Sequence, residues 1–169
     1  AFVQRAGIQP LLDALRLQCS KGRIARVLTT TYTGSTEVKA LDALVAAGVE
    51  VRVSYDVSTT RLHAKAWLFH RNSGFGTAYI GSSNLTHSAQ ISGLEWNVRV
   101  AGARNPSVVA KVGAVFESYW NSGDFVPYDR EEFLRRTAEN PHRDNLLMSP
   151  IELRPEPFQE RLLEQLAVH

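Results

Sequence analysis

The chain has 169 residues, 44% hydrophobic and 21% charged, and its 19 basic and 17 acidic side chains give a formal net charge of +2. This length suits one compact domain, and the small net charge excludes nucleic-acid binding through overall charge, so any such binding needs a local patch. The single Cys19 excludes an internal disulfide and a multi-cysteine zinc site, and no apolar run approaches the ~18 residues of a membrane span. We therefore expect a soluble, cytoplasmic protein that contacts no membrane.

The first third of the chain predicts a βαβ unit preceded by a helix. In chain order, the expected elements are a helix over residues 8–18, a strand over 23–29, a helix over 37–47 and a strand over 49–55. Pro10 suits the first turn of the first helix, Ser35 or Thr36 can cap the second, and Gly48 ends it. Alternating valines mark the second strand. The two strands of such a unit are parallel, with a right-handed crossover.

The remaining chain predicts antiparallel strands and further helices, which gives an α/β fold. The expected elements are strands over residues 62–69 and 77–82, a short helix over 84–90, a strand over 94–100, and helices over 106–120 and 131–137. Asn, Ser and Gly residues between the first two strands are typical of a turn, so these strands should be neighbours. An apolar stripe at helical spacing follows Pro106 and predicts a long amphipathic helix.

The strand over 62–69 carries two polar groups on one face. Side chains two residues apart in a strand share a face, so His63 and Lys65 should converge. A neutral imidazole beside an ammonium group makes a poor ion pair but a good cradle for a tetrahedral anion. Taken alone, His63 would be interpreted first as a hydrogen-bonded core histidine, and Lys65 as a surface lysine with a buried aliphatic stem.

The neighbouring strand ends in a cluster of hydrogen-bond donors. Ser82 and Ser83 offer hydroxyls and Asn84 an amide, and the unpaired N–H groups of the helix expected there would add to an anion site. Glu95, on the following strand, could hydrogen-bond a histidine and fix its tautomer. Alternatively, Glu95 and Asn97 are solvated outward positions of an edge strand.

These residues together resemble the phospholipase D superfamily signature, H-x-K followed by G-S-x-N and a later Glu. The chain has H-A-K at 63–65, G-S-S-N at 81–84 and Glu95 within GLEWNV. Family members usually carry an Asp five residues after the Lys, where this chain has His70. The resemblance covers roughly residues 1–120 and implies a mixed β-sheet flanked by helices, an α/β/α sandwich. It also implies phosphodiester transfer without a metal or other cofactor.

The resemblance also implies a mechanism and an assembly. One histidine, here His63, attacks phosphorus to form a covalent phosphohistidine, and a second histidine protonates the leaving oxygen. Lys65 and Asn84 would hold the non-bridging oxygens, with Ser82 and Ser83 as lesser donors. Because this chain has one H-x-K, the second histidine would come from another copy, in a homodimer joined through the His63 face.

The wider context resembles the N-terminal domain of bacterial DEAD/DEAH-box helicases. The tracts TRLHAKAWLF, TAYIGSSNLT and GLEWNV are similar to such domains, and LRPEPFQERLLEQL resembles the segment before their motor, where Gln159 would contact adenine. The expected divisions are a phospholipase D-like nuclease domain over 1–125, a connecting segment over 126–150 and the start of a helicase motor over 151–169. No G-x-x-x-x-G-K-[ST] is present, so we expect no ATP hydrolysis by these residues.

Three functions remain open at this stage. The first is a nuclease that cleaves nucleic acid, with DNA favoured over RNA. The second is a degenerate module that tethers nucleic acid for the motor, suggested by His70 where the family has Asp. The third is a lipid phosphodiesterase, which the single H-x-K and the lack of a membrane-facing segment disfavour.

Several other residues have an ordinary structural interpretation. Trp67, Phe69 and Trp96 lie within apolar strands and are expected in the core rather than as base-stacking platforms. The threonines at 29–33 follow a parallel strand, where ligands often bind, but a helix-capping run explains them equally well. We expect no metal site, since the remaining histidines lack ligand spacing; they are His70, His87, His142 and His169.

Overall fold

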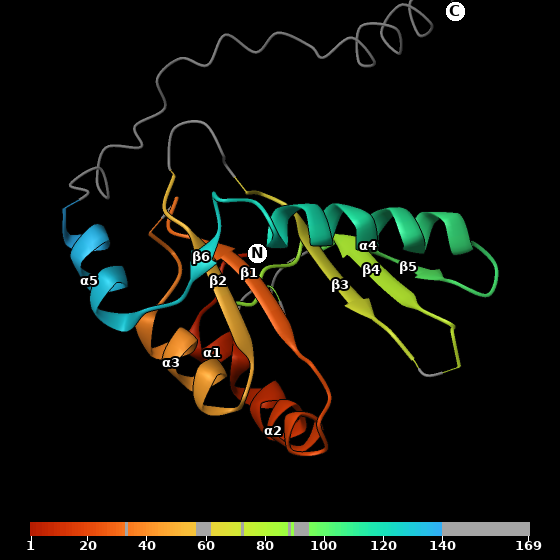
Figure 1. Ribbon diagram of the computed structural model, residues 1–169, viewed down its shortest axis with the longest axis horizontal. Coiled ribbons are helices and arrows are strands. Elements are labelled where there is room, and N and C mark those ends of the chain that lie inside the picture. Colours follow the sequence, from red (N-terminus) through yellow and green to blue (C-terminus); the bar gives the residue numbers. More distant parts are fainter. Residues whose placement is uncertain (33, 57–61, 72, 88, 90–94, 140–169) are drawn as a thin grey trace, which may run out of the picture.

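The computed structural model describes residues 1–32, 34–56, 62–71, 73–87, 89 and 95–139 and shows a mixed α/β fold (Figure 1). In chain order, the elements are α1 (Arg5–Ile8), η1 (Gln9–Leu11), α2 (Leu12–Ser20), β1 (Arg26–Thr30), α3 (Val38–Ala46), β2 (Glu50–Ser54), β3 (Lys65–Phe69), β4 (Thr77–Gly81), β5 (Asn97–Ala101), α4 (Pro106–Trp120), β6 (Val126–Pro127) and α5 (Arg130–Ala138). The strands form two three-stranded sheets, in the orders β1-β2-β6 and β3-β4-β5.

The βαβ unit is confirmed, and it holds the main core. β1 and β2 are parallel, and α3 packs on β2 so that Leu41 and Leu44 join Val51 and Val53 in the buried cluster. Each of these side chains removes apolar surface from water, worth roughly 1.5–3 kcal/mol per fully buried residue. Gly48 ends the helix with φ +87°, a left-handed conformation that favours glycine. The alternating valines therefore form the predicted second strand of the unit, and the predicted helix lies between the two strands.

The helix cap expected from Ser35 or Thr36 is wrong. The N-cap of α3 is Glu37, and no side chain caps it. The Thr36 hydroxyl instead donates to the carbonyl of Thr30 at 2.9 Å, which ties the loop back to the end of β1. The hydrogen bond to the end of β1 has replaced the cap expected at the start of α3.

The other face of β1 and β2 is covered by the C-terminal end of α4. Arg26 lies over the rings of Phe116 and Trp120, at 5.0 and 5.1 Å from their centroids, and Arg52 lies 4.8 Å from the Trp120 ring. Because Arg52 alternates with Val51 and Val53, α3 and the end of α4 pack on opposite faces of this sheet. Figure 1 shows α4 continuing across β3, β4 and β5.

The sheet of β3, β4 and β5 is an antiparallel meander, as the turn residues predicted. Lys65 pairs with Gly81 across β3 and β4, and Gly81 pairs with Asn97 across β4 and β5. The sequence predicted one mixed sheet, whereas the described residues form two hydrogen-bonded sheets. The N-terminal segment lies between them, because Val3 forms a parallel bridge with Leu85 and its carbonyl accepts from Glu37 N at 2.9 Å.

Several predicted element boundaries differ from the structure. The first helix is three consecutive pieces, with Pro10 in the 3-10 turn between α1 and α2, because proline supplies no N–H to a continuous α-helix. β1 begins at Arg26 and β3 at Lys65, three residues later than expected in each case. The helix expected over 84–90 does not begin at Asn84, since Leu85 is bridged to the N-terminal segment; residues 88 and 90 lie outside the described part.

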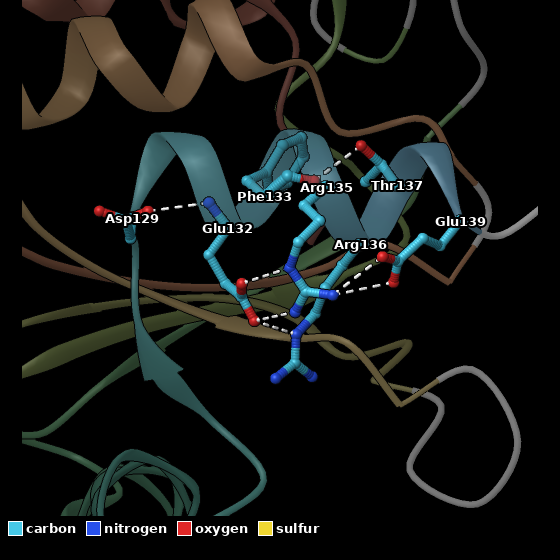
Figure 2. Close-up of polar contacts among 7 residues, drawn as sticks. All are labelled: Asp129, Glu132, Phe133, Arg135, Arg136, Thr137 and Glu139. Atoms are coloured by element: carbon cyan, nitrogen blue, oxygen red, sulfur yellow. Dashed lines mark hydrogen bonds and ion pairs between the residues drawn. The ribbon is translucent and has the colours of Figure 1, made fainter.

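The last described helix, α5, confirms the helix predicted over 131–137, and Asp129 caps it. Asp129 accepts a hydrogen bond from Glu132 N at 2.8 Å, and Phe133 is buried against the core. Figure 2 shows the guanidinium groups of Arg135 and Arg136 donating hydrogen bonds to the carboxylate of Glu132. The later part of the expected connecting segment, and the segment over 151–169 with Gln159, lie outside the described residues.

Candidate active site

His63 and Lys65 meet at the start of β3. The Nζ atom of Lys65 lies 3.0 Å from both ring nitrogens of His63, so the predicted convergence is present. His63 is exposed and Lys65 half-buried in the single chain. The interpretation of His63 as a core histidine is therefore wrong, and the pair opens to solvent where a ligand could reach it.

The surroundings of the pair favour a neutral imidazole. Partial burial of the ring and the charge of Lys65 lower the pKa of His63 below its usual value of 6.5. Burial also lowers the pKa of Lys65, and the negative charge of Glu95 partly offsets that effect. A neutral imidazole keeps the lone pair that a nucleophile needs.

The hydroxyl of Ser82 is held by the segment that leads into β5. Ser82 Oγ donates to the carboxylate of Glu95 and accepts from Trp96 N at 3.1 Å, while Ser82 N donates to Trp96 O at 3.0 Å. Its one hydroxyl proton is therefore engaged. Ser82 can orient the end of β4 in this arrangement, but it has no donor left for an anion.

Glu95 was expected to orient a histidine, and the structure gives it a different partner. Its hydrogen bond comes from Ser82, and none joins it to His63 although both residues are described. Its charge acts on Lys65 instead. Glu95 therefore links the serine end of β4 to the cationic side of the site.

Within the described part of the chain, Asn84 and Ser83 keep groups that can donate. The Oδ1 atom of Asn84 accepts from Phe2 N at 3.0 Å, which leaves its amino group for another acceptor. Ser83 Oγ accepts from Asn97 Nδ2 at 2.6 Å and keeps its hydroxyl proton. Asn97, read from the sequence as a possible solvated position, is thus a residue that positions the site. The pairing of Gly81 with Asn97 is the signal that would have revealed it.

The aromatic residues near the site divide between core and surface. Trp67 is half-buried and packs against the core, as expected. Phe69 is 47% exposed and Trp96 86% exposed, so their assignment to the core is wrong. Phe69 meets Tyr79 edge-on at 6.0 Å, and by strand alternation both lie on the Lys65 face. An open aromatic surface therefore extends from the site along β3 and β4.

Two other sequence features lie apart from His63 and Lys65. Thr29 and Thr30 are buried, and Thr29 Oγ1 lies 3.1 Å from Thr36 Oγ1, so these hydroxyls fasten a loop. His70 is exposed just beyond the end of β3, whereas Lys65 is at its start. The position at which this chain has His70 in place of the family Asp therefore lies at the opposite end of the strand from His63.

Comparison with known proteins gives one family. The model described as cardiolipin synthase, phospholipase D-like domain, matches residues 7–120, which include His63, Lys65, Asn84 and Glu95. No curated protein matches the chain. Among the described helices, none is both long and apolar enough to cross a membrane.

Proposed function

Because this chain belongs to the family of cardiolipin synthase-type, phospholipase D-like domains, we propose that it is a metal-independent nuclease that cleaves DNA through a phosphohistidine on His63. The family supports phosphodiester chemistry in general. The choice of a nucleic acid rests on the likeness of its strands to helicase-associated domains. The proposal places the protein in the cytoplasm, as one part of a helicase-containing chain.

The observation that carries the proposal is the contact between His63 and Lys65. An ammonium group 3.0 Å from the imidazole gives one side of the site a positive charge beside an uncharged nucleophile. A phosphodiester would bring a negative charge to Lys65, in addition to the influence of Glu95. Lys65 and the amino group of Asn84 would then hold the non-bridging oxygens as charge develops on them.

The proposed reaction has two displacements. A ring nitrogen of His63 attacks phosphorus, an N–P bond forms, and the P–O bond to the leaving strand breaks. The leaving oxygen takes a proton from the imidazolium of a second His63. Water then attacks phosphorus, gives a proton back to that second histidine, and breaks the N–P bond.

A homodimer joined through the His63 face supplies the second histidine. Phe69 and Tyr79 are exposed on the Lys65 face of β3 and β4, and an exposed apolar surface is typical of one that a partner covers. A two-fold axis near His63 would bring the two imidazoles to one phosphate. The proposal includes an α/β/α sandwich for each copy, supported by α3 and α4 on opposite faces of β1 and β2.

A tethering module is the second candidate, and one observation favours it. Ser82 donates its hydroxyl hydrogen bond to Glu95, so the site offers a phosphate one donor fewer than the family resemblance implies. Such a site could hold a phosphate without stabilising the transition state. This module would bind nucleic acid for an attached motor and leave the strand intact.

Cleavage of labelled single- and double-stranded DNA in EDTA separates the two candidates. Wild type should cut, and His63→Ala should lose cutting by more than the ~10²- to 10⁴-fold of a lone acid or base. His70→Ala is the matched control, since it removes an exposed histidine at the other end of β3, and it should still cut. Binding without cutting by both wild type and His63→Ala would favour the tethering module. A monomer at micromolar concentration by sedimentation would contradict the shared site.

A further inference from the structure

A second concentration of positive charge lies away from His63, among the helices that cover β1 and β2. A groove of about 420 Å³ is lined by residues of α1, α2 and α3, which Figure 1 shows side by side. Arg5, Arg16 and Lys39 contribute its cationic side chains, one from each helix. Positive side chains that line one groove focus the electric field there and raise the local concentration of anions.

The guanidinium group of Arg5 is incompletely satisfied. Its Nη1 atom is buried and has no hydrogen-bond partner within the described part of the chain. A buried donor without a partner is rare in folded proteins, and an ion or ordered water usually accounts for it. The backbone of Arg5 is fixed nearby, because its N–H donates to Glu37 Oε2 at 2.8 Å. This contact fixes the position of α1 beside the start of α3, from which the Arg5 side chain extends to the groove.

The acidic residue of the groove does not oppose an anion. Asp42 accepts from the Tyr128 hydroxyl at 2.7 Å through Oδ1 and from Arg130 Nε at 3.0 Å through Oδ2. Both carboxylate oxygens are thus engaged, and Arg130 balances the charge. Arg16 is paired with Asp13 at 2.9 Å, but both side chains are largely exposed, so the pair is weak and an anion could compete for Arg16.

We propose that this groove binds a phosphate group, held by Arg5, Arg16 and Lys39 and independent of the chemistry at His63. The planar guanidinium fork matches two oxygens of a tetrahedral phosphate, and Lys39 adds a point charge. The phosphate could belong to a nucleic-acid backbone or to a free phosphorylated molecule. Both sources present the same oxygens to the groove.

The test is a ¹H–¹⁵N NMR titration of the 169-residue protein with inorganic phosphate, matched in ionic strength with chloride. Amides of Ala6, Ala43 and Ala46 should shift and saturate with phosphate but not with chloride. Arg5→Gln should weaken that binding about tenfold or more, as expected for a lost charge-assisted hydrogen bond. Lys39→Gln, at an exposed position that cannot disturb the core, should weaken it several-fold.

Lys111→Gln is the matched control, because Lys111 is an exposed lysine of α4 outside the groove. It should leave the groove affinity unchanged. Equal shifts with chloride, no saturation, or equal affinity in Arg5→Gln would overturn the proposal. A parallel titration with a short single-stranded oligonucleotide identifies the source: tighter groove binding than inorganic phosphate indicates a backbone, and equal or weaker binding indicates a free phosphate.

Discussion

Substitution of Gly81 should change both the stability of the fold and the geometry of the candidate site. This residue ends β4 directly before Ser82 and pairs with Asn97 on β5. A Cβ atom added there would overlap the carbonyl oxygen of Trp96 and the side-chain oxygen of Asn97, and would lie 2.8 Å from Asn97 Cα. Two of these three atoms are backbone, so a rotamer change cannot relieve the overlap.

The magnitude follows from that geometry. Ordinary van der Waals contact is about 3.4 Å or more, so Asn97 Cα must move by at least about 0.6 Å and the Trp96 carbonyl by more. Overpacking of this kind destabilises a protein by about 1–3 kcal/mol. The same movement displaces Trp96, whose N–H and carbonyl both bond Ser82. A misplacement of about 1 Å near reacting groups reduces rate by roughly 100-fold.

Gly81→Ala should therefore lower the free energy of unfolding in urea by about 1–3 kcal/mol and reduce kcat/KM by roughly 100-fold. The activity assay is hydrolysis of bis(p-nitrophenyl) phosphate in EDTA, at a temperature where the variant is folded. Gly123→Ala is the control, because a Cβ there meets nothing within 4 Å. If Gly81→Ala matches this control in both stability and activity, the reasoning about the end of β4 is wrong.

Two further predictions concern the electrostatics of the site and the attachment of α4. Lys65→Met should raise the pKa of His63, but not fully to 6.5, because partial burial of the ring remains. An NMR titration of the ring protons, assigned with His63→Ala, measures the shift. An unchanged pKa would exclude the influence of Lys65. Arg26→Ala should lower the free energy of unfolding by about 1–2 kcal/mol, since the variant loses contact with two aromatic rings of α4. The control Arg104→Ala, at an exposed position, should change it little. Equal effects of the two variants on urea unfolding would refute the role of Arg26 in attaching α4.

The parts of the fold that the sequence predicts are those set by local periodicity. The valines of β2 and the apolar stripe of α3 specify the βαβ unit, and the turn after Phe69 specifies the pairing of β3 with β4. Each of these features depends on residues that are close together in the sequence, so a local pattern predicts it.

The parts that were missed depend on contacts distant in sequence. Leu85 follows a serine-rich stretch that suits a helix start, yet its N–H and carbonyl bond Phe2 and Gln4. Thr36 has the chemistry of a cap but bonds the end of β1. Tertiary partners outweigh these local preferences, and no pattern in a single sequence reveals them.

The candidate site shows the same division. His63 and Lys65 converge because of a two-residue spacing, which the sequence states directly. The link from Ser82 to Glu95 instead requires the register of β4 against β5, and that register also brings Asn97 to Ser83. The contact between His63 and Lys65 was therefore predictable, whereas the residues that hold the end of β4 were not.

The most direct test of a nucleophilic His63 is to trap the covalent intermediate. Wild type and His63→Ala are mixed with end-labelled DNA in EDTA and quenched in alkali, which preserves a phosphohistidine bond, and the digested protein is then examined by mass spectrometry. We expect a nucleotide fragment joined through phosphorus to the peptide containing His63, and no such adduct in the variant. An adduct on another residue, or the same adduct in His63→Ala, would contradict the assignment of His63 as the nucleophile.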